Sequence, residues 1–167
     1  MLDKNLFETA FESLHSEDHR MRTWLAMVGC FTSVERSLRR RLNRVFGSSL
    51  PRYDVLTALV QFPDGLTMGQ LASRLMVTKG NITGVVGRLQ EHRFVRQATS
   101  RTDRLVQVVT LTAKGRELWD QMHAEYRAVI DELLSPLSKA QAKALTQSLT
   151  QAQEKIDHVL QQAEKPR

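Results

Sequence analysis

Two short helical patterns joined by about three residues, within 67–92, restrict the fold of this chain more than any other feature. Thr67-Met68-Gly69-Gln70 has the spacing of a capping box, in which the Thr hydroxyl and the Gln amide satisfy exposed N–H groups. A second helix is expected over about 79–92, where apolar residues recur at helical spacing: Ile82, Val85, Val86 and Leu89. Helices joined by so short a turn cannot lie antiparallel, so they cross steeply and the first supports the second.

Periodicity and turn residues predict the remaining elements. Ser49 and Thr112 precede helical patterns as caps, 138–141 forms a second capping box, and 100–104 is the polar tip of a hairpin. The expected elements are long helices over 18–46, 113–134 and 139 to about 163, a shorter helix over 50–61, and strands at Phe94–Thr99 and Leu105–Leu111. The chain is therefore mainly α with a small β-hairpin.

The positive charge is concentrated in one segment. The net charge is +6, and residues 74–116 alone carry nine Lys or Arg against two Asp or Glu. A single-sign field this local attracts a polyanion, and nucleic acid is the commonest one. A generically basic surface kept for solubility is the alternative.

Composition also indicates where the protein works. Cys30 is the single cysteine, which excludes an internal disulfide and fits a reducing compartment. The N-terminus lacks the basic and apolar regions of a signal peptide, and no apolar stretch approaches a membrane span. We expect a soluble cytoplasmic protein with no membrane partner.

The outer face of the helix expected at 79–92 is polar, basic and rich in glycine. It presents Thr78, Lys79, Gly80, Asn81, Thr83, Gly84, Gly87 and Arg88. Each glycine within a helix costs about 1 kcal/mol relative to alanine, so three of them indicate a close approach to another surface. A DNA major groove admits such a helix, with short polar groups on phosphates and Asn81 or Arg88 on base edges. Tight packing on a neighbouring helix is the alternative.

The hairpin tip offers a second contact. Arg101 and Arg104 are suited to a narrow, electronegative minor groove. Asp103 would be repelled by phosphate, so it is expected to bond to tip N–H groups or to an arginine. An ordinary solvated tip is the alternative.

Several motifs together resemble the MarR family over about 50–116, and the helix order is similar over nearly the full chain. The motifs are Pro51–Leu56, Leu66–Ala72, Val77–Thr83, and Asp103-Arg104 followed by Leu111–Gly115. The resemblance implies a winged helix-turn-helix flanked by dimerisation helices, with a DNA-binding lobe at 49–112 between helices at 1–48 and 113–167. It also implies a homodimer that reads an inverted repeat in double-stranded DNA, and a small aromatic, anionic or phenolic effector that releases it.

The expected DNA contacts combine the residues above with the cap of the first short helix. They are Thr67, Gln70, Thr78, Lys79, Gly80, Asn81, Thr83, Gly84, Arg88, Arg101, Asp103 and Arg104. Three positions depart from the family pattern. Leu105 replaces the usual wing arginine, Arg93 stands where a glycine is common, and Gly84 often aligns with an arginine, so base readout is expected to rely more on DNA shape.

An effector pocket is expected between the first two helices. Its candidate lining residues are Trp24, Val28, Phe31, Tyr53 and Leu56. Core packing is the alternative for each of them.

The remaining reactive residues indicate no further site. Cys30 is expected to be a buried structural thiol, and His15 and His19 have a metal-compatible spacing but fit a solvated helix end better. No catalytic motif is present, so no enzyme activity, cofactor or metal is expected. The prediction is a ligand-responsive DNA-binding repressor. A protein-interaction adaptor or an RNA-binding protein are the alternatives.

Overall fold

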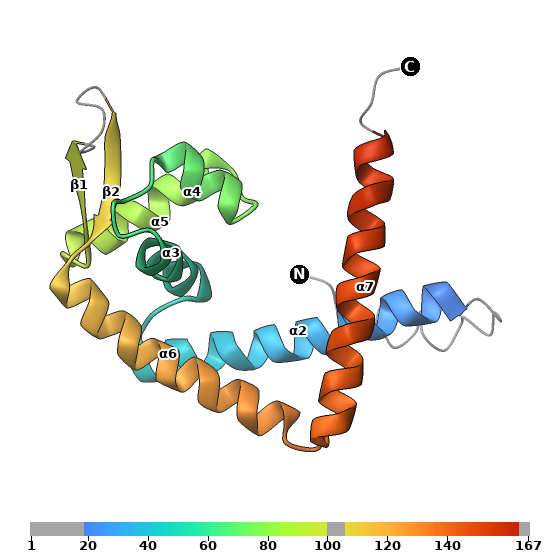
Figure 1. Ribbon diagram of the computed structural model, residues 1–167. Coiled ribbons are helices and arrows are strands. Elements are labelled where there is room, and N and C mark those ends of the chain that lie inside the picture. Colours follow the sequence, from blue (N-terminus) through green and yellow to red (C-terminus); the bar gives the residue numbers. More distant parts are fainter. Residues whose placement is uncertain (1–18, 100–105, 164–167) are drawn as a thin grey trace. The chain divides into compact units, whose positions relative to one another are not determined.

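The computed structural model describes residues 19–99 and 106–163 of the 167-residue chain (Figure 1). The elements in chain order are α2 (His19–Phe46), α3 (Leu50–Gln61), α4 (Met68–Arg74), α5 (Lys79–Glu91), β1 (Val95–Thr99), β2 (Gln107–Leu111), α6 (Ala113–Leu134) and α7 (Lys139–Ala163). This order confirms the expected mainly helical class with a two-stranded hairpin. The chain divides into two compact units, one ending at Ile130 and the other beginning at Asp131.

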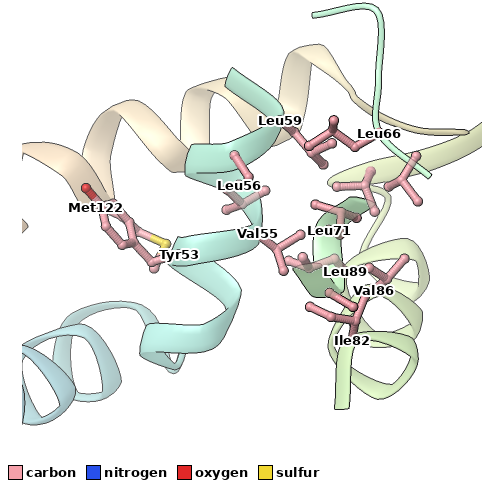
Figure 2. Packing of buried hydrophobic residues seen from close by; sticks show 14 of the residues in the cluster. Tyr53, Val55, Leu56, Leu59, Leu66, Leu71, Ile82, Val86, Leu89 and Met122 are labelled. Atoms are coloured by element: carbon pink, nitrogen blue, oxygen red, sulfur yellow. The ribbon is translucent and has the colours of Figure 1, made fainter. Parts of the chain in front are cut away.

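The core of the first unit is built from one face of each of its short helices. Leu56 of α3, Leu71 of α4 and Leu89 of α5 are buried and pack in one cluster (Figure 2). Leu42 of α2 and Met122 of α6 are fully buried in the same cluster. The long helices on either side therefore share the core of α3, α4 and α5.

The start of α4 is capped as expected, and the structure shows a cap on α5 as well. The Gln70 N–H donates to Thr67 Oγ1 at 3.1 Å and the Thr67 N–H donates to Gln70 Oε1 at 2.8 Å. Thr78 caps α5 by accepting from the Asn81 N–H at 3.4 Å. These bonds satisfy first-turn donors that have no intrahelical partner.

The prediction that the Ser49 side chain caps α3 is wrong. Ser49 is the N-cap residue but its side chain makes no capping hydrogen bond. Its backbone carbonyl instead accepts from the Arg52 and Tyr53 N–H groups, at 3.1 and 3.2 Å. Pro51 lies in the first turn and has no N–H group, so one fewer backbone donor there needs an acceptor such as the Ser49 hydroxyl.

A non-glycine residue with positive φ follows the C-cap of each of α4 and α5, namely Met76 at 52° and Arg93 at 60°. The Val77 N–H donates to the Ala72 carbonyl at 3.0 Å, and the Phe94 N–H donates to the Leu89 carbonyl at 2.9 Å. These are the long hydrogen bonds of Schellman motifs, which close a helix on a left-handed residue. The first of them fixes the short turn between α4 and α5.

The hairpin is antiparallel, with Val95 opposite Leu111 and Thr99 opposite Gln107. Both strands are shorter than expected, because β1 begins at Val95 and β2 at Gln107. Leu66 exchanges two backbone hydrogen bonds with Val109, at 3.1 and 2.8 Å, and so ties the segment before α4 to the sheet.

The second unit contains α7, which starts with the second predicted capping box. The Ser138 N–H donates to Gln141 Oε1 at 2.9 Å and the Gln141 N–H donates to Ser138 Oγ at 3.3 Å. No residue of α7 is buried. Among the helices that the structure describes, none combines the length and the apolar composition needed to cross a membrane.

The prediction of a buried Cys30 is wrong, because the thiol is exposed. Only Leu38 and Leu42 of α2 are buried, so the half of the helix that holds Cys30 contributes no residue to the core of the chain. Helical periodicity identified an apolar face there but could not show what covers it.

Candidate nucleic-acid interface and adjoining pocket

Helix α5 packs on the core through one side and leaves the other side open. Ile82, Val86 and Leu89 are buried on the packed side. The seven residues of the predicted contact set from Thr78 through Arg88 are all exposed: Thr78, Lys79, Gly80, Asn81, Thr83, Gly84 and Arg88.

The glycines of α5 face open space. A Cβ added at Gly80, Gly84 or Gly87 would meet no heavy atom within 4 Å. Tight packing on another helix, the alternative explanation for them, is therefore not found among residues 19–99 and 106–163. No neighbour within the described part of the chain therefore requires these positions to lack a side chain.

The polar groups at the start of the two short helices are partly used within the protein. Thr67 and Gln70 hold each other in the capping box, and the Thr83 hydroxyl donates to the Lys79 carbonyl at 2.9 Å. Thr67 is half-buried, whereas Gln70 is exposed. These residues thus stabilise the helix starts, and their contact with nucleic acid stays a prediction.

Three basic side chains next to this face have no partner within the described residues. Lys79 and Arg88 on α5 and Arg96 on β1 are exposed and form neither a side-chain hydrogen bond nor an ion pair there. Arg116, by contrast, pairs with Asp120 at 3.4 Å. Arg96 was not among the predicted contacts, although it lies in the basic segment and on a strand beside the predicted tip.

The predicted wing contacts Arg101, Asp103 and Arg104, and the departure at Leu105, lie outside the described residues. Their role in minor-groove binding stays a prediction. His15 also lies outside them, and His19 is exposed. Within the described part of the chain, no three His, Cys, Asp or Glu residues gather into a possible metal site.

A pocket with a volume of about 590 Å³ lies between α2, α3, α5 and α6. Most of its wall is apolar and comes from Phe31, Val34, Leu38, Leu50, Pro51, Leu75, Val77, Ile82 and Val85. Because several of these residues belong to α5 or to the turn before it, a molecule in the pocket would touch the helix that carries the open basic face.

Only one predicted effector residue, Phe31, lines this pocket. Tyr53 and Leu56 belong to the core, with 5% and 0% of their surface exposed. Trp24 is 58% exposed, and neither it nor Val28 lines the pocket. The pocket lies between α2 and α3, where the sequence analysis expected one, but helical spacing did not identify the side chains that line it. Its use by an effector stays a prediction.

The pocket contains three charged side chains that the sequence analysis did not single out, Glu35, Arg39 and Asp54. Arg39 Nη2 and Nε lie 2.6 and 3.0 Å from Glu35 Oε1. Asp54 has neither a hydrogen bond nor an ion pair among the described side chains. Burial raises the pKa of Asp54 to about 6, with Arg39 opposing the rise and Glu35 adding to it. Its four-residue spacing from apolar Leu50 was the available sign that it faces inward.

An aromatic stack runs from the pocket along α6. Tyr126 lines the pocket and stacks on Tyr53, with ring centroids 4.7 Å apart. The Tyr53 hydroxyl and His123 Nδ1 are hydrogen-bonded at 2.8 Å, and His123 stacks on Trp119 at 4.6 Å. Such offset ring pairs add to the packing of α3 against α6.

Known proteins share both the sequence and the fold of this lobe. Residues 46–104 match the MarR family. The transcriptional activatory protein BadR of Rhodopseudomonas palustris is 33% identical over 95 residues, which is 55% of this chain and 54% of that protein. The matched region thus spans about half of this curated relative.

Solved structures match over most of the chain. A MarR family transcriptional regulator from Silicibacter pomeroyi is 28% identical, with a TM-score of 0.72 over 84% of this chain and 96% of that one. The Mycobacterium tuberculosis MarR family protein Rv2887, solved in complex with DNA, is 27% identical, with a TM-score of 0.65 over 81% and 98%. The fold and the open α5 face define a winged helix-turn-helix protein. In the sequence of residues 46–104 and in its fold, this chain is similar to MarR family regulators. BadR and the Silicibacter protein are described as regulators of transcription and not as enzymes, in agreement with the sequence analysis.

Proposed function

We propose that this protein binds duplex DNA sequence-specifically by placing α5 in the major groove. The open face of α5 carries the proposal, since its glycines have no neighbour within 4 Å and Lys79 and Arg88 have no partner among the described residues. The DNA complex of Rv2887, which is 27% identical, supports the same use of the fold.

The contacts divide by chemistry. Thr78, Lys79 and Gly80 lie at the start of α5, where the helix dipole and exposed N–H groups favour phosphate. Asn81, Thr83 and Arg88 face outward further along and are assigned to base edges. Gly84 allows the backbone to come close, and the hairpin tip is assigned to the minor groove.

The protein acts as a homodimer through its long helices. Leu145, Leu149, Ile156 and Leu160 recur at spacings that place them on one face of α7, and all four are at least 42% exposed. Trp24 and Phe31 of α2 are also exposed. Exposed apolar residues in such a row favour a second copy, with dimerisation helices at 1–48 and 113–167 around a lobe at 49–112.

Two lobes related by a two-fold axis require an inverted-repeat operator with half-sites roughly 34 Å apart. A small, largely apolar ligand in the pocket between α2 and α5 would shift α5 and release the operator, so the protein acts as a repressor. BadR is described as an activatory protein. A reporter placed behind the selected operator, assayed with and without the gene, distinguishes repression from activation.

Selection of bound fragments from random duplex DNA tests the proposal. Recovery of an inverted repeat is the expected result. Lys79→Glu and Arg88→Glu should each weaken binding to it at least about tenfold, because each replaces a cation with a group that phosphate repels. Arg127→Glu, a reversal at an exposed position of α6, is the matched control and should leave the affinity nearly unchanged.

Two other functions predict different results. An adaptor that uses the winged helix to bind a protein would show no salt-dependent affinity for any duplex. An RNA-binding protein would release duplex DNA when structured RNA is added in competition. Either result, or a reversal at Lys79 that unfolds the protein, contradicts the proposed role.

A further inference from the structure

The charged groups of the pocket between α2, α3, α5 and α6 differ from those that would hold an anion. Of the residues that line it, only Glu35, Arg39 and Asp54 are charged, so acidic groups exceed basic ones. An anion would need a cation that is free to bind it. Arg39 is instead held by Glu35 through two short contacts to Oε1, at 2.6 and 3.0 Å.

Asp54 is the charged residue of the pocket that has neither a hydrogen bond nor an ion pair among the described side chains. It lies on α3, and no side chain within residues 19–99 or 106–163 donates a hydrogen bond to it or pairs with it. A partly buried carboxylate without a donor is unfavourable, and a ligand that supplies a donor recovers that free energy. The other polar groups of the wall, on Asn81 and Tyr126, carry no charge to offset it.

The rest of the wall fits an apolar ring. Phe31, Leu38, Ile82 and Val85 surround the space, and Tyr126 contributes an aromatic face that is held by its stacking on Tyr53. A volume of about 590 Å³ lies within the usual range of small-molecule pockets.

We propose that this pocket binds an aromatic ligand with a cationic amine, whose N–H groups donate to the Asp54 carboxylate, and that it rejects aromatic carboxylates. The inference rests on the proposed ligand response. It narrows the chemistry of the effector and differs from the anionic or phenolic ligand that the family resemblance implied.

Three probes with the same ring and substituents of similar size separate the alternatives: 1-naphthylmethylamine, 1-naphthalenemethanol and 1-naphthoate. Calorimetric titration of each into the DNA-free protein at pH 7.5 gives the dissociation constants. We expect the amine to bind at least about tenfold more tightly than the carboxylate, with the alcohol between them, since one hydrogen bond to a charged group corresponds to that ratio.

Two variants test the assignment of the charges. Asp54→Asn should weaken binding of the amine about tenfold while leaving binding of the alcohol nearly unchanged, and its melting curve checks that it folds. Glu35→Gln frees Arg39 and should strengthen binding of the naphthoate. Equal or tighter binding of the naphthoate by the unaltered protein, no binding of the amine, or an unchanged preference in Asp54→Asn overturns the inference.

A separate DNA-binding assay with saturating amine tests the ligand response. Loss of DNA affinity supports it. If the amine binds in the Asp54-dependent way but leaves DNA affinity unchanged, the ligand class stands and the proposed release mechanism fails.

Discussion

Gly84 and Gly115 both lie inside helices, and their surroundings are opposite. A Cβ added at Gly84 meets nothing within 4 Å, whereas one added at Gly115 would overlap the carbonyl oxygen of Phe94. In the free protein the first position accepts a side chain and the second accepts none. Packing within the described residues therefore requires the glycine at 115 but not the one at 84.

Gly84→Ala should stabilise the free protein by about 0.5–1 kcal/mol, because alanine loses less backbone entropy in a helix. The same methyl group should weaken binding to the operator, because it holds α5 away from the groove. Urea unfolding and DNA titration measure the two effects. Unchanged DNA affinity in a stabilised variant would show that no surface approaches Gly84 closely.

Gly115→Ala should destabilise the protein by roughly 1–3 kcal/mol, the usual cost of forcing a group into a packed site. The start of α6 cannot move away easily, because Thr112 Oγ1 accepts from the Gly115 N–H at 3.0 Å and donates to the Phe94 carbonyl at 3.0 Å. The urea midpoint measures the loss. A midpoint equal to that of the parent protein would contradict the close approach.

The Asp54 carboxyl group in the pocket makes the stability of the protein depend on pH. Burial raises its pKa from 3.8 to about 6, so the folded protein binds this proton more tightly than the unfolded chain does. The contribution to stability is therefore complete below about pH 4 and is lost as pH rises through 6. The charged and titratable groups that interact with it are Glu35 and Arg39 on α2, Tyr53 on α3 and Tyr126 on α6.

Asp54→Asn should accordingly raise the melting temperature at pH 7.5, with the difference from the parent protein disappearing near pH 4. Melting curves at intervals of half a pH unit measure it. A constant difference across this range would mean that the carboxyl group does not carry the effect.

Among the elements, those fixed by local chemistry were predicted best. Both capping boxes formed, because Thr67 with Gln70 and Ser138 with Gln141 need only three residues of spacing and their own backbone. The end of α5 was harder to predict, since Arg93 adopts a φ of 60° that usually favours glycine. Two hydrogen bonds hold Arg93 in this conformation, from its own N–H to the Gln90 carbonyl and from the Phe94 N–H to the Leu89 carbonyl. These bonds are visible in the structure and not in the sequence.

Elements whose environment depends on distant residues were predicted less well. Cys30 lies in an apolar helical pattern, yet no described residue covers it. Tyr53 lies between the core and α6 and does not line the pocket, because its ring stacks on the rings of Tyr126 and His123. Asp54, its neighbour in sequence, faces the pocket. A period identifies a face of a helix, but the partner of that face comes from tertiary packing.

The apolar row on α7 gives a prediction for that helix. Leu149→Asp should dissociate the dimer, because it places a charge among residues assigned to the interface. Sedimentation measures the mass over a range of protein concentrations. Gln147→Asp adds the same charge away from the row and should leave the dimer intact. If both variants keep the mass of the parent dimer, α7 does not form the interface.

At the scale of the whole molecule, the core shared by the long helices and the lobe would couple the proposed dimerisation to the proposed DNA binding. Leu42 of α2 and Met122 of α6 are buried with Leu56 of α3. If either long helix moves, the side chains around α3 must therefore repack. Because the pocket is lined by α2, α3, α5 and α6, a ligand bound there would act on the same set of contacts.

The dimer and the DNA contact make one joint prediction. If each lobe neutralises about four phosphates, the logarithm of the binding constant should fall with the logarithm of salt concentration with a slope of roughly −7. Leu149→Asp, as a monomer with one lobe, should give about half that slope and a lower affinity for the same operator. Lys79→Glu should keep the dimer and make the slope less steep by about two, since one phosphate contact is lost from each lobe. Titrations in 50 to 300 mM salt measure all three slopes. If the monomeric variant retains the full slope, one lobe already makes every phosphate contact, and the inverted-repeat arrangement is wrong.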